Sequence, residues 1–193
     1  SIFSTAAIVL SPLGEVTVAA HQIAISITSQ LFMIPMSLAI ALTIRVGTYY
    51  GSQNWAAMRR VQIVGLATGT VFALITMLLL WILRAEIVSL YTFDYDVAVL
   101  AVYLVLFAIA YQLMDAWQVS AAGCLRGMQD TKGPMWITML AYWIITFPVG
   151  IYLSRFTDMG AAGVWIGLIV GLTVACILLI SRLMIINKRI AQL

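Results

Sequence analysis

Long apolar runs separated by short polar breaks constrain this chain more than any other feature of its sequence. A bilayer has a hydrocarbon core about 30 Å thick, which a helix of roughly 20 apolar residues can cross. A typical soluble domain has about 25% charged residues, whereas this chain has 9% charged residues, 64% hydrophobic residues and a mean hydropathy of +1.08. The sequence therefore predicts an all-α, polytopic membrane helix bundle, with lipid as its main solvent.

Turn-forming residues divide the chain into one partial helix and five full spans. The predicted spans, taken as one compact bundle, are residues 1–10 (partial), 16–48, 55–83, 96–127, 134–154 and 161–186. Proline predicts a kink at Pro35 and another near Pro148. The polar stretch 84–96 has room for a short surface helix. Because the chain starts at Ser1 within an apolar stretch of about half a span, we expect it to be a fragment of a longer protein.

The distribution of charge predicts how the bundle lies in its membrane. One set of connections is predominantly basic; with the C-terminal tail it carries Arg45, Arg59, Arg60, Arg126, Lys132, Arg182, Lys188 and Arg189, with Asp130 as its acid. The alternate connections carry Glu15, Glu86, Asp94, Asp96 and Asp158, with Arg84 and Arg155. The positive-inside rule places the basic side and the C-terminus in the cytoplasm.

One carboxylate, Asp115, lies within the apolar run 96–127. Arg126 is expected at the cytoplasmic interface, and Asp115 precedes it by eleven residues. At about 1.5 Å per residue, Asp115 lies roughly 16 Å into the membrane. A charged side chain at that depth costs at least ~2.5–3.5 kcal/mol, so intramembrane acids face the bundle interior, a partner or water.

Asp115 belongs to a polar stripe that lacks a basic partner. Tyr111 and Gln118 share its helical face, and Gln112 lies on the flank. Because no Lys or Arg is expected at this depth, Asp115 is predicted to bind a proton or a mobile cation. The alternative is a structural Asp that only hydrogen-bonds a neighbouring helix.

Other polar residues could line the same cavity. On the second helix, Ser26, Ser29, Gln30, Met33 and Ser37 recur at helical spacing, although hydrogen bonding between helices explains them equally well. On the fifth helix, Tyr142 and Trp143, together with Thr146, could contact a cation through their aromatic rings. The alternative is that these three residues serve ordinary packing or lie at the membrane interface. His21 is interpreted as an interfacial or capping residue, with a proton relay as the alternative.

The two cysteines, Cys124 and Cys176, lie in apolar helical stretches without a metal-ligand spacing, so they are expected to be buried thiols. No cofactor is expected beyond a coupling ion. A basic cluster interleaved with aromatic residues is also missing, which argues against nucleic acid as a partner.

Three segments carry a family resemblance: VAAHQIAISITSQLFMIPMSLAIALTIRVGTYYG, YQLMDAWQVSAAGCLRGMQDTKGPM and YWIITFPVGIYL. Their specific elements are AAHQ, the P-M-S…IRVG run and D-x-x-Q-x-x-x-x-G-x-L-R-G-x-x-D, which begins at Asp115. They resemble the bacterial, cation-coupled type of the multidrug and toxic compound extrusion (MATE) family. The resemblance covers essentially the whole chain and corresponds to helices seven to twelve.

The resemblance implies a transporter of two six-helix lobes in the bacterial inner membrane. It implies export of cationic, amphipathic drugs in exchange for Na⁺ or H⁺ by alternating access. The family's cation site falls on Asp115 and on Tyr111, one turn earlier. The second carboxylate of that lobe would precede Ser1, and the first lobe would be the missing partner, so we expect the chain alone to be inactive.

Three alternative functions make different demands on the sequence. A lipid-linked sugar flippase of the same superfamily would need basic residues at depth for its pyrophosphate, where only an acid is expected. An intramembrane aspartyl protease would need two carboxylates sharing a site. A structural membrane subunit predicts that Asp115→Asn leaves activity intact.

Overall fold

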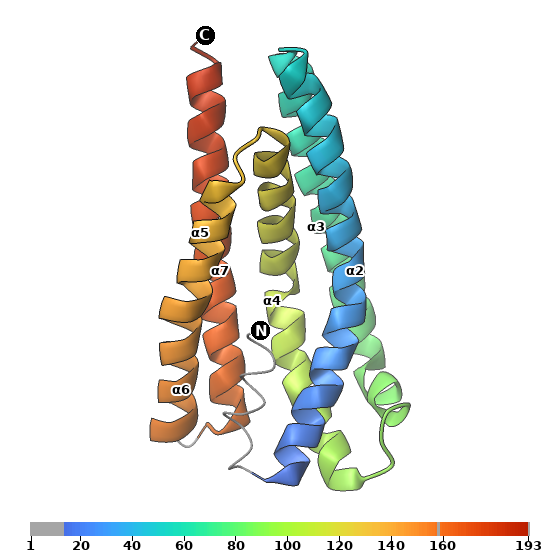
Figure 1. The fold of residues 1–193 in the computed structure, drawn as a ribbon. Coiled ribbons are helices and arrows are strands. Elements are labelled where there is room, and N and C mark those ends of the chain that lie inside the picture. The colour runs from blue at the N-terminus through green and yellow to red at the C-terminus, as the bar shows by residue number, and fades with distance from the viewer. Residues whose placement is uncertain (1–13, 158, 193) are drawn as a thin grey trace.

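The computed structural model describes residues 14–157 and 159–192, and these form a bundle of long helices (Figure 1). The predicted partial helix 1–10 lies outside the described residues. In chain order the elements are α2 (Glu15–Gly51), α3 (Trp55–Ser89), α4 (Tyr95–Gly127), α5 (Lys132–Leu140), the π-helical segment η2 (Ala141–Thr146), α6 (Phe147–Phe156) and α7 (Ala161–Ile190). Within this part of the chain, five helical spans are long and apolar enough to cross a membrane, which is the number of full spans that the sequence predicts.

The helices alternate in direction, as the charge pattern requires. Figure 1 shows the turn between α2 and α3, the connection from α4 to α5 and the C-terminus toward one end of the bundle. The start of α2 and the other connections lie at the opposite end (Figure 1). The basic connections therefore share one end of the molecule.

The prediction of a surface helix within 84–96 is wrong. Helix α3 continues through Arg84 to Ser89, and α4 begins at Tyr95 after a short turn. Asp94 is the N-cap of α4: its Oδ1 accepts hydrogen bonds from the backbone N–H groups of Asp96 and Val97 at 2.9 and 3.2 Å. An acid at this position satisfies the free N–H groups of the first helical turn.

The fifth span is not one regular helix. Its middle, η2, is a π-helical segment in which hydrogen bonds reach one residue further along the chain. At its end, the N–H of Phe147 donates to the carbonyl of Tyr142. This wide turn lies directly before Pro148, which has no N–H to donate. Helix α2, in contrast, is continuous through Pro35.

Helix α4 lies against α2, α3 and α7, and glycines bring its backbone close to α2. A Cβ atom built on Gly123 would lie 2.6 Å from the carbonyl oxygen of Ala39, and one on Gly127 would lie 2.7 Å from that of Thr43. The Thr43 hydroxyl also lies 3.0 Å from the Gly123 carbonyl oxygen, with hydrogen-bonding geometry. Small residues therefore produce the tight helix contact that membrane proteins use.

Candidate functional site

A cavity of about 310 Å³ lies beside the middle of α4. Its lining comes from four elements, α2, α4, η2 and α7, and consists of Thr28, Ser29, Phe32, Tyr111, Asp115, Tyr142, Leu168 and Leu172. Asp115 is half-buried and is the only charged side chain in this described lining. The cavity thus combines one acid with hydroxyl groups, aromatic rings and apolar walls.

The spacing on α4 explains why Tyr111 and Asp115 meet at this cavity. They are four residues apart, so they lie one above the other on the same helix face. Tyr111 is 5% exposed, and its ring stacks on Trp165 of α7 with centroids 6.0 Å apart and planes inclined by 19°. Because Trp165 is fully buried, the Tyr111 ring has a fixed support.

The same tryptophan contacts His21. The two rings meet edge-on, with centroids 5.7 Å apart, and His21 is 1% exposed. His21 therefore packs inside the bundle, where its ring meets Trp165 of α7. The aromatic contacts form a continuous path from His21 through Trp165 to Tyr111.

The π-helical segment places Tyr142 on the opposite wall of the cavity. Its hydroxyl is 2.7 Å from Nε2 and 3.1 Å from Oε1 of Gln118, so a single amide holds the phenol. Gln118 is buried and lies behind Tyr142 rather than on the cavity surface. Thr146 is buried too, and its hydroxyl donates to the Ala141 carbonyl oxygen at 3.3 Å within the wide turn. Trp143, by contrast, is 58% exposed.

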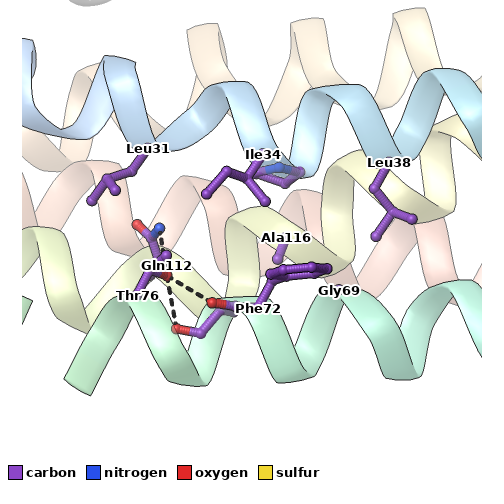
Figure 2. A pocket seen from close by; sticks show the side chains of 10 residues that line it. Leu31, Ile34, Leu38, Gly69, Phe72, Thr76, Gln112 and Ala116 are labelled. Carbon is purple, nitrogen blue, oxygen red and sulfur yellow. Dashed lines mark hydrogen bonds between the residues drawn. The ribbon is translucent and has the colours of Figure 1, made fainter. Parts of the chain in front are cut away.

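Gln112 lies away from the Asp115 cavity. Its Nε2 donates to the Thr76 hydroxyl at 3.2 Å, and that hydroxyl donates back to the carbonyls of Phe72 and Ala73. Figure 2 shows these groups at a separate, much smaller pocket of about 10 Å³ between α2, α3 and α4, which Pro35 also lines. Gln112 therefore joins α4 to α3.

Most of the predicted polar stripe on α2 also lies elsewhere. Gln30 donates to the Tyr91 hydroxyl at 3.0 Å, and Ser37 donates to the Met33 carbonyl at 2.8 Å, both at exposed positions. Ser26 is half-buried and does not line the cavity. Among the stripe residues, only Ser29 reaches it.

Four lining residues escaped the sequence interpretation. Thr28 and Phe32 adjoin the predicted stripe and could have been found by following its helical face. Leu168 and Leu172 carry no signal, because apolar residues fill all of α7 near them. Only the packing of α7 against α4 identifies these leucines.

The described residues hold no group of three or more His, Cys, Asp or Glu side chains suited to a metal ion. A cation beside Asp115 would instead find one carboxylate and the neutral oxygens of Thr28, Ser29, Tyr111 and Tyr142. Oxygen donors of this kind suit a hard cation. Lys and Arg are missing from the described lining, so no basic side chain there neutralises the carboxylate.

The MatE family model matches residues 1–152, which cover most of the chain and include Asp115 and Tyr142. The chain belongs to the MatE family. Among curated MatE relatives, it is 69% identical over 192 residues to a probable multidrug resistance protein NorM of Acinetobacter baylyi. It is 46% identical over 188 residues to the multidrug resistance protein NorM of Photobacterium profundum.

The chain spans less than half the length of these relatives. The alignments cover 100% and 95% of this chain, but only 43% and 41% of the two NorM proteins. A third relative, the multidrug resistance protein MdtK of Proteus mirabilis, is 42% identical, with 98% of this chain and 42% of that protein covered.

Solved MATE structures share the fold. An outward-facing MATE family transporter of the MOP superfamily superposes with a TM-score of 0.90 at 16% identity, covering 100% of this chain and 43% of that one. The eukaryotic MATE transporter AtDTX14 superposes with a TM-score of 0.83 at 23% identity, covering 92% and 40%. The all-α membrane bundle predicted from the sequence is thereby confirmed.

Proposed function

We propose that this chain forms the second six-helix lobe of a multidrug efflux antiporter. The whole transporter would export cationic, amphipathic compounds in exchange for Na⁺ or H⁺ by alternating access. Two observations support the wider assignment: the relatives are named multidrug resistance proteins, and the chain covers less than half of each. The cavity that contains Asp115 supports the role of this lobe.

The proposed mechanism begins with the cost of an unpaired charge within the membrane. An isolated carboxylate there is costly, so Asp115 is stable only with a bound proton or cation. Since the described lining offers no basic partner, the bound ion is exchangeable. Protons, Na⁺ and an organic cation would then compete for one carboxylate, which couples entry of the ion to release of the drug.

The remaining lining residues have distinct proposed roles. The hydroxyls of Thr28, Ser29 and Tyr111 would complete the oxygen shell of Na⁺. The aromatic faces of Phe32 and Tyr142 would contact the apolar part of a drug and its positive charge. Leu168 and Leu172 make the far wall apolar, which suits an amphipathic compound.

The alternative functions fit the cavity less well. A carrier of a lipid-linked pyrophosphate would need basic groups where the described lining has an acid. An aspartyl protease would need a second carboxylate, and Asp115 is the only one in the described lining. A structural subunit gives no reason for an acid at a cavity of this size.

The proposed location is a bacterial inner membrane. The described spans make this a multi-pass membrane protein. The basic end of the bundle would lie in the cytoplasm, together with the C-terminus.

The deciding experiment compares Asp115→Asn with Asp96→Asn in the protein at its natural length. Asp96 is a matched control because it lies on the same helix but at its exposed end. Drug efflux should be lost in Asp115→Asn and kept in Asp96→Asn, with both variants inserted at wild-type levels. Varying Na⁺ and pH separately identifies the coupling ion. Wild-type efflux by Asp115→Asn would refute the proposal.

A further inference from the structure

A second cavity, of about 430 Å³, opens between α2 and α3 near the turn that joins them. Its lining comprises Leu38, Ala41, Leu42, Arg45, Tyr49, Ala57, Arg60, Val61, Val64, Gly65 and Thr68. None of these residues lines the Asp115 cavity. We call this space the α2–α3 groove.

Two arginines give the groove its charge. Arg45 of α2 and Arg60 of α3 are both exposed. Neither forms an ion pair within the described part of the chain, in which Arg182 pairs with Asp130 instead. The described lining includes no acid. Two uncompensated guanidinium groups therefore converge on one space.

The groove changes from basic to apolar along its length. From Arg45 back to Leu38, α2 covers roughly 10 Å, and from Arg60 to Thr68, α3 covers roughly 12 Å, at about 1.5 Å per residue. Both paths lead away from the connecting turn and toward the middle of the bundle. Beyond the arginines on these two paths, the lining side chains are apolar except for Thr68, whereas Tyr49 lies between Arg45 and the turn.

The floor of the groove is built by a close helix contact. The Leu42 side chain occupies the space where a Cβ atom of Gly65 would lie, so α2 and α3 touch there. Val64 of the lining is 57% exposed, and Ile44 and Ile63, which neighbour lining residues in the sequence, are 63% and 68% exposed. Such surfaces suit acyl chains rather than water.

We propose that the α2–α3 groove binds an anionic phospholipid. The guanidinium groups of Arg45 and Arg60 hold its phosphate, which arginine matches by paired hydrogen bonds. Tyr49 provides a further polar contact, and an acyl chain follows Leu38, Val64 and Thr68. A soluble anion would use only the arginines, whereas a phospholipid fills both the basic and the apolar parts. Basic pockets between helices at the cytoplasmic side of a membrane are suited to such headgroups.

This inference does not depend on the transported substrate. It is tested on the natural-length protein, stripped of lipid in detergent and titrated with dioleoyl phosphatidylglycerol. Native mass spectrometry measures the bound lipid. Arg45→Gln/Arg60→Gln is compared with Lys188→Gln/Arg189→Gln, which removes the same charge from exposed positions of α7 outside the groove.

We expect the groove variant to bind this lipid about 30-fold more weakly, from the typical attraction of two basic residues to an anionic membrane. The α7 variant should retain it. Val64→Trp, at an exposed position, should also weaken binding by blocking the acyl path without changing charge. Phosphatidylcholine should bind more weakly than phosphatidylglycerol.

Three results would overturn the proposal. Equal losses in the two charge variants would mean a general electrostatic effect. Protection of the protein against thermal unfolding by inorganic phosphate alone, equal to that by the lipid, would mean a simple anion site. Unchanged binding by both the charge variant of the groove and Val64→Trp would place the lipid elsewhere.

Discussion

Replacing Gly123 with alanine tests whether close backbone contact between α4 and α2 stabilises the bundle. The added methyl group would lie 2.6 Å from the Ala39 carbonyl oxygen and 3.0 Å from its Cα atom. Because real Cβ atoms essentially never lie within 3.0 Å of another heavy atom, the helices must separate by some tenths of an ångström. The obstacle is backbone, so no side chain can rotate away to relieve it.

The expected cost follows from two opposing effects. Overpacking in a close-packed interior typically costs about 1–3 kcal/mol. Alanine offsets up to about 1 kcal/mol of this through its higher helix propensity. We therefore expect Gly123→Ala to destabilise the protein by about 1–2 kcal/mol. Separation also lengthens the 3.0 Å contact between the Thr43 hydroxyl and the Gly123 carbonyl.

The assay uses the thiol of Cys176, which is 2% exposed and free. In a background where it is the only cysteine, a thiol-reactive fluorophore reports thermal unfolding. Gly51→Ala is the control, because a Cβ there would meet no heavy atom within 4 Å. The unfolding temperature should fall for Gly123→Ala and stay or rise for Gly51→Ala.

A double variant sharpens the test. Gly127→Ala meets the Thr43 carbonyl at 2.7 Å on the same interface, so one helix shift relieves both clashes. The double variant should therefore cost less than the sum of the single variants. Wild-type unfolding of Gly123→Ala, or strict additivity, would contradict the close-contact explanation.

Two further predictions concern the basic end of the bundle. The Arg182 guanidinium lowers the pKa of Asp130, and Arg182 Nε donates to Asp130 Oδ2 at 2.5 Å. This pair should therefore stabilise the protein by about 0.5–1 kcal/mol above pH 4, as partly exposed ion pairs do. The unfolding temperatures of the wild type and Asp130→Asn should converge as the pH falls below the ordinary aspartate value of 3.8, and a constant gap would contradict this. The second prediction concerns Asn187, whose Nδ2 donates to Oε1 of the buried Gln62 at 2.7 Å. Gln62→Leu leaves Asn187 without this acceptor, so it should lower the free energy of unfolding by about 1–3 kcal/mol. The double variant Gln62→Leu/Asn187→Leu should lose less than the sum of the two single variants, as measured by thermal unfolding.

The sequence predicted the spans well because each depends on local composition. Helix ends are marked by the limits of each apolar run, by Gly51 and by Pro134. These signals can be found without knowing how the helices pack. The prediction for 84–96 is wrong because charged residues can end an apolar run without ending the helix, and α3 continues to Ser89. Two acids near the end of this stretch, Asp94 and Asp96, could have indicated a helix start, since an acid before a helix caps it.

The site was only partly predictable, for a geometric reason. Successive residues of a helix are about 100° apart, so Tyr111 and Gln112 point toward different helices although both are within four residues of Asp115 in the sequence. The sequence cannot say which flank meets α7 and which meets α3. It likewise marked Gln30 and Ser37 as polar without showing that they lie on an exposed face of α2. Leu168 and Leu172 could be found only from the assembled helices.

The wide turn η2 sets the rotational phase between the two halves of one span. Within η2, Tyr142 lines the Asp115 cavity. In α6, which follows, Gly150 lies against Gly167 of α7: a Cβ atom built on Gly167 would be 2.6 Å from the Gly150 Cα. Because its hydrogen bonds reach one residue further, the wide turn holds one residue more than an ordinary helical turn. Deleting one residue between Tyr142 and Phe147 would therefore restore an ordinary α-helix and leave Gly150 facing α7. A second deletion would have no extra residue to remove, so it would rotate the rest of the span by about 100° and turn Gly150 away from α7. The segment therefore tolerates the loss of one residue but not of two.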